Sequence, residues 1–70
     1  MYPKQVSELL NGQVFYHKTL TNKDGTPLKA KRNGKNKLWK TRPHFFQIPV
    51  KRGLKEYGYI DQDNFEQWTI

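Results

Sequence analysis

The most distinctive chemistry in the sequence is a basic block between residues 25 and 55. This block contains ten of the 13 Lys and Arg residues and no Asp or Glu, in a chain with a formal net charge of +7. An unopposed run of cations attracts polyanions, and nucleic acids release counterions when Lys and Arg side chains neutralise their phosphates. The alternative is a solvated sheet edge whose lysines protect it from aggregation. The number of unopposed cations favours nucleic-acid binding.

Seven of these cations lie in residues 29–42, which the sequence predicts to be a β-hairpin. Leu28 and Ala30 alternate with lysines before Asn33-Gly34, a pair typical of a turn, and residues 35–40 would return as the second strand. The predicted phosphate contacts in this hairpin are Lys29, Lys31, Arg32, Lys35, Lys37, Lys40 and Arg42.

Trp39 and Phe45 are the predicted base-stacking residues. A type I turn over Arg32-Asn33-Gly34, with Gly34 left-handed, would turn Trp39 away from Leu28. A two-residue turn would place Trp39 opposite Leu28, so the hairpin register decides its exposure. Phe45 and Phe46 point to opposite faces of a strand, and Phe45 is the ring that we expect to be exposed. The alternative is that both faces are covered and every ring serves the core. The remaining predicted phosphate contacts are Lys51 and Arg52.

Candidate catalytic and metal-binding residues are sparse. The chain has no Cys and a single Ser, so it has no thiol nucleophile, no thiolate metal site and no disulfide. His17 and His44 would permit acid–base cleavage of RNA without indicating it, because histidines are often only hydrogen-bonded or solvated. We therefore expect no enzymatic activity, no metal site and no cofactor.

The acidic residues Asp61, Asp63 and Glu66 lie near the C-terminus. A calcium loop would need a glycine and a distal glutamate that this segment lacks, and helix capping explains the acids better. Alternatively, they contact a basic patch on a partner or on a second copy of the chain. The expected state is a monomer or a weak homodimer.

The elements that must position these residues are predicted from the spacing of apolar residues. Apolar residues behind Pro3 recur with helical spacing, which predicts a helix over residues 3–10 that ends at Asn11-Gly12. Pro49 predicts that its strand lies at an edge or next to a bulge. The other predicted elements are strands over residues 14–21, 46–50 and 57–60 and a closing helical turn after Asp61 that places Phe65 and Trp68 on one face.

These elements predict an α+β fold. We expect a small curled antiparallel sheet, or an SH3-like or OB-like half-barrel, of about five short strands with a short helix at each end. Residues 1–70 would form one domain, and ten aromatic residues would supply much of its core. No apolar run reaches the roughly 18 residues of a membrane span, and the N-terminus lacks a signal pattern, so we expect a cytoplasmic protein that does not enter the membrane.

Several stretches resemble small basic proteins that are encoded by tailed bacteriophages. These stretches are residues 24–30 (DGTPLKA), 33–35 (NGK), 39–43 (WKTRP) and 49–54 (PVKRGL). The resemblance covers about residues 20–68. It implies a protein that works in the host bacterial cytoplasm, and it brings no catalytic residues and no settled activity.

The leading hypothesis is a non-enzymatic domain that binds DNA or RNA through phosphate contacts and aromatic stacking. The alternative is a protein-binding module, a phage inhibitor or accessory factor that uses its basic surface against an acidic host protein. Base specificity cannot be read from the sequence.

Overall fold

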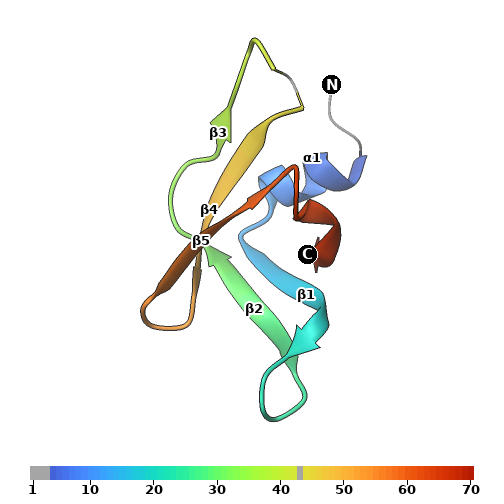
Figure 1. The fold of residues 1–70 in the computed structure, drawn as a ribbon, viewed down its shortest axis with the longest axis vertical. Coiled ribbons are helices and arrows are strands. Elements are labelled where there is room, and N and C mark those ends of the chain that lie inside the picture. The colour runs from blue at the N-terminus through green and yellow to red at the C-terminus, as the bar shows by residue number, and fades with distance from the viewer. Residues whose placement is uncertain (1–3, 43) are drawn as a thin grey trace.

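The computed structural model describes residues 4–42 and 44–70. The described residues have the predicted α+β fold, with one short helix and a single antiparallel sheet (Figure 1). In chain order, the elements are α1 (Lys4–Asn11), β1 (Val14–Thr21), β2 (Pro27–Arg32), β3 (Lys37–Leu38), β4 (Phe46–Arg52), β5 (Glu56–Asp61), the 3-10 turn η1 (Phe65–Gln67) and β6 (Trp68–Thr69). The predicted helix is therefore present from Lys4 onward, and Pro3 lies outside the described residues.

Strand β4 organises the sheet because it is paired along both edges. Gln47 pairs with β5 and with β3, and Lys51 pairs with β5 and with β2. Strands β2 and β3 must therefore lie end to end along the edge of β4 that is opposite β5. Beyond β2, the sheet continues through β1 to β6.

The predicted hairpin over residues 29–42 is wrong, because β2 and β3 both pair with β4 and not with each other. From Lys31 to Lys37 the chain advances six residues, whereas their partners on β4, Lys51 and Gln47, are four residues apart. The two extra residues form a bulge around Gly34, which has a φ of +127°. Asn33-Gly34 therefore interrupts an extended segment and does not reverse it.

Pro49 explains where the bulge lies. The Asn33 N–H donates to the Pro49 carbonyl at 2.7 Å, and a Cβ on Gly34 would lie 3.3 Å from the Pro49 ring. Because proline offers no N–H to a neighbouring strand, a regular ladder cannot run past it on both sides. Of the two predicted alternatives for Pro49, an edge strand is wrong, because β4 pairs along both of its edges, and the bulge lies in the segment opposite Pro49.

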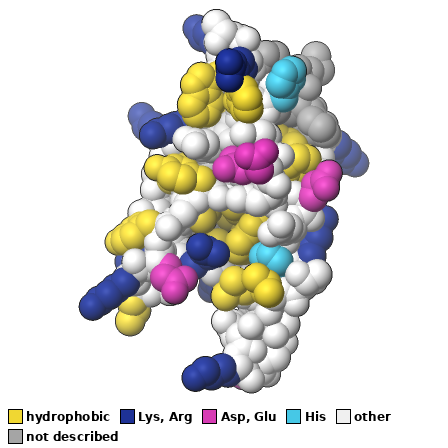
Figure 2. Space-filling view, in the orientation of Figure 1, with side chains coloured by type: hydrophobic (Ala, Val, Ile, Leu, Met, Phe, Trp, Pro, Cys, Tyr) yellow, Lys and Arg dark blue, Asp and Glu magenta, His cyan; other side chains and the backbone are white. Residues whose placement is uncertain are grey.

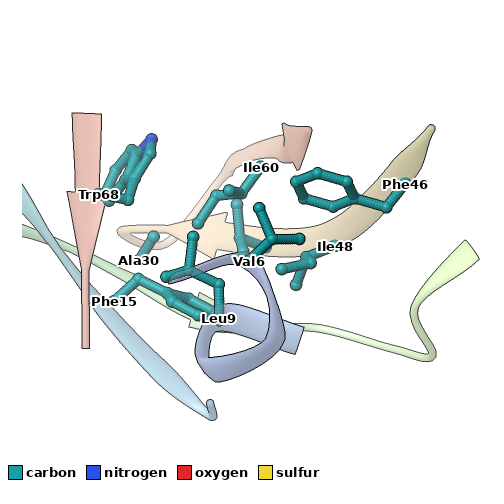
Figure 3. Close-up of a cluster of buried hydrophobic side chains, with 9 residues drawn as sticks. Val6, Leu9, Phe15, Ala30, Phe46, Ile48, Ile60 and Trp68 are labelled. Atoms are coloured by element: carbon teal, nitrogen blue, oxygen red, sulfur yellow. The ribbon is translucent and has the colours of Figure 1, made fainter. Parts of the chain in front are cut away.

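One cluster of buried apolar side chains forms the core (Figure 3). Its members are Val6 and Leu9 of α1, Phe15 of β1, Ala30 of β2, Phe46, Ile48 and Val50 of β4, Ile60 of β5 and Trp68 of β6. Strands β5 and β6 are at opposite ends of the sheet, yet both contribute to this cluster, so the sheet curls around it. Within the described residues these two strands do not pair with each other, and the sheet is open.

Side chains from β2 and the bulge hold the end of α1. The Arg32 guanidinium donates to the carbonyls of Leu9 and Leu10, and the Asn36 amide donates to the Leu10 carbonyl at 2.7 Å. The last carbonyls of a helix have no partner within the helix, and the negative end of its dipole favours a cation. Arg32 therefore joins the helix to the sheet.

Trp68 does not belong to the closing helical turn that the sequence predicts. The 3-10 turn ends at Gln67, and Trp68 has an extended backbone that pairs with His17 of β1. Its side chain is only 4% exposed and packs edge-on against the His17 ring at 4.9 Å. The sixth strand is thus formed by residues whose apolar spacing also fits a helix.

We predict that Arg32→Ala destabilises the fold. The expected loss in the free energy of unfolding is about 1.5–3 kcal/mol, which is typical of hydrogen bonds from a charged group. In a domain of this size, such a loss lowers the melting temperature by several degrees. Lys35→Ala removes the same charge from an exposed residue and is the matched control. Equal melting temperatures for the two variants in circular dichroism would contradict this role of Arg32.

The two tryptophans provide a second test of the fold. Trp68→Ala is expected to lower the free energy of unfolding by about 3–5 kcal/mol, as for a buried ring. Trp39 is 40% exposed, so Trp39→Ala should cost much less. Urea denaturation measures both values, and a larger loss for Trp39→Ala would mean that the core is wrongly described.

Candidate nucleic-acid interface

The sheet has an outer face that is turned away from the core. Phe15, Ala30, Val50 and Ile60 all belong to the buried cluster. Successive side chains of a strand point to opposite faces, so the neighbours of these four residues point outward.

One row of outer-face side chains crosses four strands in register. Val14 of β1 lies opposite Lys31 of β2, which in turn lies opposite Lys51 of β4. Tyr57 of β5 is the next residue in the row, because it lies opposite Lys51. Neither lysine has a carboxylate as a cross-strand neighbour. Like charges directly opposite each other destabilise a sheet. An anion bound between the two lysines would offset this repulsion and so stabilise the folded protein.

Exposed tyrosines accompany the lysines on this face. Tyr57 is 64% exposed and Tyr59 is 46% exposed. Lys51 Nζ lies 5.6 Å from the centre of the Tyr57 ring, and Lys37 Nζ lies 5.9 Å from the centre of the Tyr59 ring. A cation is attracted to the face of an aromatic ring. The face therefore presents charges and flat rings side by side.

A basic cleft opens beside the Lys31–Lys51 pair of the outer row. Beyond the Lys31–Lys51 pair, the β1–β2 and β4–β5 hairpins separate (Figure 1). In Figure 2 their ends form separate projections with a notch between them. The cleft has a volume of about 680 Å³ and is lined by Asn22, Leu28, Lys29, Lys31, Arg32, Asn33, Lys51 and Gly53. With four cations and no acid in its lining, it suits an anion.

A second pocket lies at the other end of β4. Its volume is about 340 Å³, and its lining residues are Trp39, Thr41, Arg42, Phe45, Gln47 and Gln62. The Arg42 guanidinium lies 5.0 Å from the centre of the half-buried Phe45 ring. This pocket combines two aromatic rings with two amides and a single cation.

The structure divides the predicted contact residues into groups. Those on the outer face or beside the cleft are Lys29, Lys31, Lys37 and Lys51. Those between β3 and β4 are Trp39, Lys40, Arg42 and Phe45. Lys35 is exposed in the bulge.

Two predicted phosphate contacts lie on the core side of the sheet. Arg32 also lines the cleft, but it alternates with the exposed Lys31, and its guanidinium donates to the end of α1. Arg52 alternates with Lys51, is half-buried, and lies against Gly58 of β5. We therefore leave both residues out of the proposed phosphate-binding set.

The exposed tyrosines of the outer face were not among the predicted contact residues. Tyr16 lies opposite Lys29, and Tyr57 and Tyr59 follow the lysine row. The outward position of Tyr57 and Tyr59 could have been predicted from the alternation along residues 57–60. If Ile60 points into the core, both tyrosine rings point to the outer face. Without the strand register, however, nothing connected these rings to the lysines.

His17 has a structural role. It is 7% exposed, and its Nδ1 accepts the backbone N–H groups of Thr19 at 3.2 Å and Leu20 at 2.9 Å. The ring proton is therefore on Nε2, which donates to the Gln67 amide oxygen at 3.3 Å. This network joins the irregular end of β1 to η1. His44 is exposed and lies edge-on to Phe45.

Two of the acidic side chains, Asp24 and Asp61, are engaged in local turns. Asp24 accepts hydrogen bonds from the Thr26 hydroxyl at 2.6 Å and the Thr26 N–H at 3.0 Å, which lower the pKa of its carboxyl. Asp61 accepts the Asp63 N–H at 2.9 Å. Residues 4–42 and 44–70 contain no group of three His, Cys, Asp or Glu side chains that could hold a metal ion.

Comparison with protein-family models, curated proteins and solved structures gives no match to this chain. The resemblance to small phage proteins therefore stays a prediction. No helix in the described part of the chain has the length and apolar character needed to cross a membrane.

We predict that Lys31→Glu stabilises the fold, because it places a carboxylate opposite Lys51. Such cross-strand pairs typically contribute about 0.2–1 kcal/mol, and the repulsion between the two lysines is removed as well. Calorimetry at low salt should show a higher melting temperature. Lys35→Glu changes the net charge equally and is the control. A similar increase for both variants would show that only the net charge matters.

Proposed function

We propose that the outer face binds a single strand of nucleic acid without catalysing a reaction on it. The observation that carries the proposal is the adjacent Lys31–Lys51 pair, which lacks an acidic neighbour and continues into the exposed Tyr57. The lysines would neutralise phosphates, and the tyrosines would stack on bases.

The proposed phosphate contacts are four lysines at different positions on the outer face. They are Lys29, Lys31, Lys37 and Lys51. Neighbouring strands of a sheet are about 4.8 Å apart, so these charges are distributed across the face and can follow a backbone. The basic cleft beside Lys31 and Lys51 extends the same positive surface.

The exposed rings favour a single strand over a duplex. A ring can stack only on a base whose face is accessible, and stacking inside a duplex hides the base faces. Tyr57 and Tyr59 are two residues apart on β5 and point to the same side. They can therefore accept neighbouring bases of one strand.

The salt dependence of binding tests this proposal. If four phosphates are neutralised, log K against log salt should have a slope of about −2.8 for a single strand. The double variant Lys31→Ala, Lys51→Ala should reduce the slope to about −1.4. Fluorescence anisotropy with labelled homopolymeric DNA and RNA strands of about eight nucleotides measures both slopes.

Matched variants separate this face from general charge attraction. Lys4→Ala, Lys23→Ala removes the same two charges from α1 and from the β1–β2 turn and should leave the slope near −2.8. In the same assay, Tyr57→Ala should weaken binding by about 1–3 kcal/mol, whereas Tyr57→Phe should keep most of the affinity.

Two results would contradict the proposal. One is equal slopes for the two double variants, and the other is no binding of any strand at low salt. In the second case, capture of an acidic bacterial protein that survives nuclease treatment would support the protein-binding alternative.

A further inference from the structure

We infer that the pocket lined by Trp39, Phe45, Gln47 and Gln62 holds one unpaired nucleobase and gives the protein a base preference. This inference rests on the proposed function, because the base would belong to the strand bound on the outer face. We call this site the base pocket.

The base pocket is continuous with the outer face. Gln47 lines the pocket and also stands on the outer face of β4, directly opposite Lys37. Lys37 in turn lies over the Tyr59 ring. A strand that crosses the face from Lys51 past Tyr59 therefore reaches the pocket.

The rings of the pocket suit a flat ligand. Trp39 is 40% exposed although it is a large apolar side chain, so a stacked base would cover surface that now faces water. Arg42 lies over the Phe45 ring, and this cation–π contact restrains the ring at the edge of the pocket.

The polar groups of the pocket distinguish it from the basic cleft. The cleft is lined by four cations, whereas the pocket has a single cation and two amides. The Gln62 Oε1 accepts the Phe46 N–H at 3.4 Å, which restrains the amide, and its Nε2 has no acceptor among the described residues. An amide offers one donor and one acceptor side, as the edges of nucleobases do. The lining therefore suits a neutral base better than a phosphate.

Trp39 fluorescence reports directly on this pocket. Trp68 is 4% exposed and Trp39 is 40% exposed, so a stacked base should quench mainly Trp39. The probes are homopolymeric strands of about eight nucleotides and an abasic strand of the same length. The abasic strand keeps the phosphates and should still bind to the lysines. We expect quenching with strands that carry bases, no quenching with the abasic strand, and no base-dependent quenching in Trp39→Phe.

Amide variants test the base preference. Gln47→Leu and Gln62→Leu are expected to change the ratio of dissociation constants among the homopolymers by roughly three- to tenfold, with an unchanged salt slope. Trp39→Ala should weaken binding of all base-carrying strands by roughly tenfold and leave the abasic strand unaffected. Because Gln62 also bonds to β4, Gln47→Leu keeps the test valid if Gln62→Leu folds poorly.

The outcomes separate the inference from the proposed function. Two results would overturn the base pocket and leave the outer face intact, provided that strands bind with the expected salt slope. One is Trp39 quenching that is the same with the abasic strand. The other is an unchanged ratio of dissociation constants among the homopolymers in both amide variants. If no strand binds, both are overturned.

Discussion

Strand β4 is hydrogen-bonded along both edges, and the core and the outer face both depend on this pairing. Phe46, Ile48 and Val50 point from β4 into the buried cluster. Between them, Gln47 and Pro49 point outward, and Lys51 continues this outward set. Any shift of the register by one residue would exchange the two sets and would place a lysine in the core. Burial of three apolar side chains therefore also determines which polar groups share the outer face.

Alternation along β2 gives adjacent cations different roles. Lys31 stands on the outer face opposite Lys51, whereas Arg32 turns inward and donates to the carbonyls at the end of α1. The first arrangement costs stability, because two like charges are neighbours. The second contributes stability, because it supplies donors to carbonyls that the helix leaves without partners. A cost of this kind is expected where a ligand supplies the missing counter-charge.

The surface offers three chemically different sites along one path. The cleft between the hairpins is lined by four cations, the outer face alternates lysines with tyrosines, and the pocket at the other end of β4 contains aromatic rings and amides. Charge attracts any polyanion, exposed rings require accessible bases, and amides respond to the pattern of donors and acceptors on a base. Selectivity of the proposed binding would therefore increase from the cleft toward the pocket.

Most of the local structure and the sign of the charge could be predicted from the order of the residues. Apolar spacing predicted α1 and most strands, Pro49 predicted an edge strand or a bulge, of which only the bulge is present, and the absence of acids from residues 25–55 predicted a basic surface. Which strands pair follows only from the tertiary fold. Alternation shows that a segment is extended, but its partner depends on which distant apolar residues can be buried together. For that reason Asn33-Gly34 became a bulge and not a turn, Trp68 joined β6, Arg32 turned to α1, and the tyrosines of β5 came to lie beside the lysines of β2 and β4.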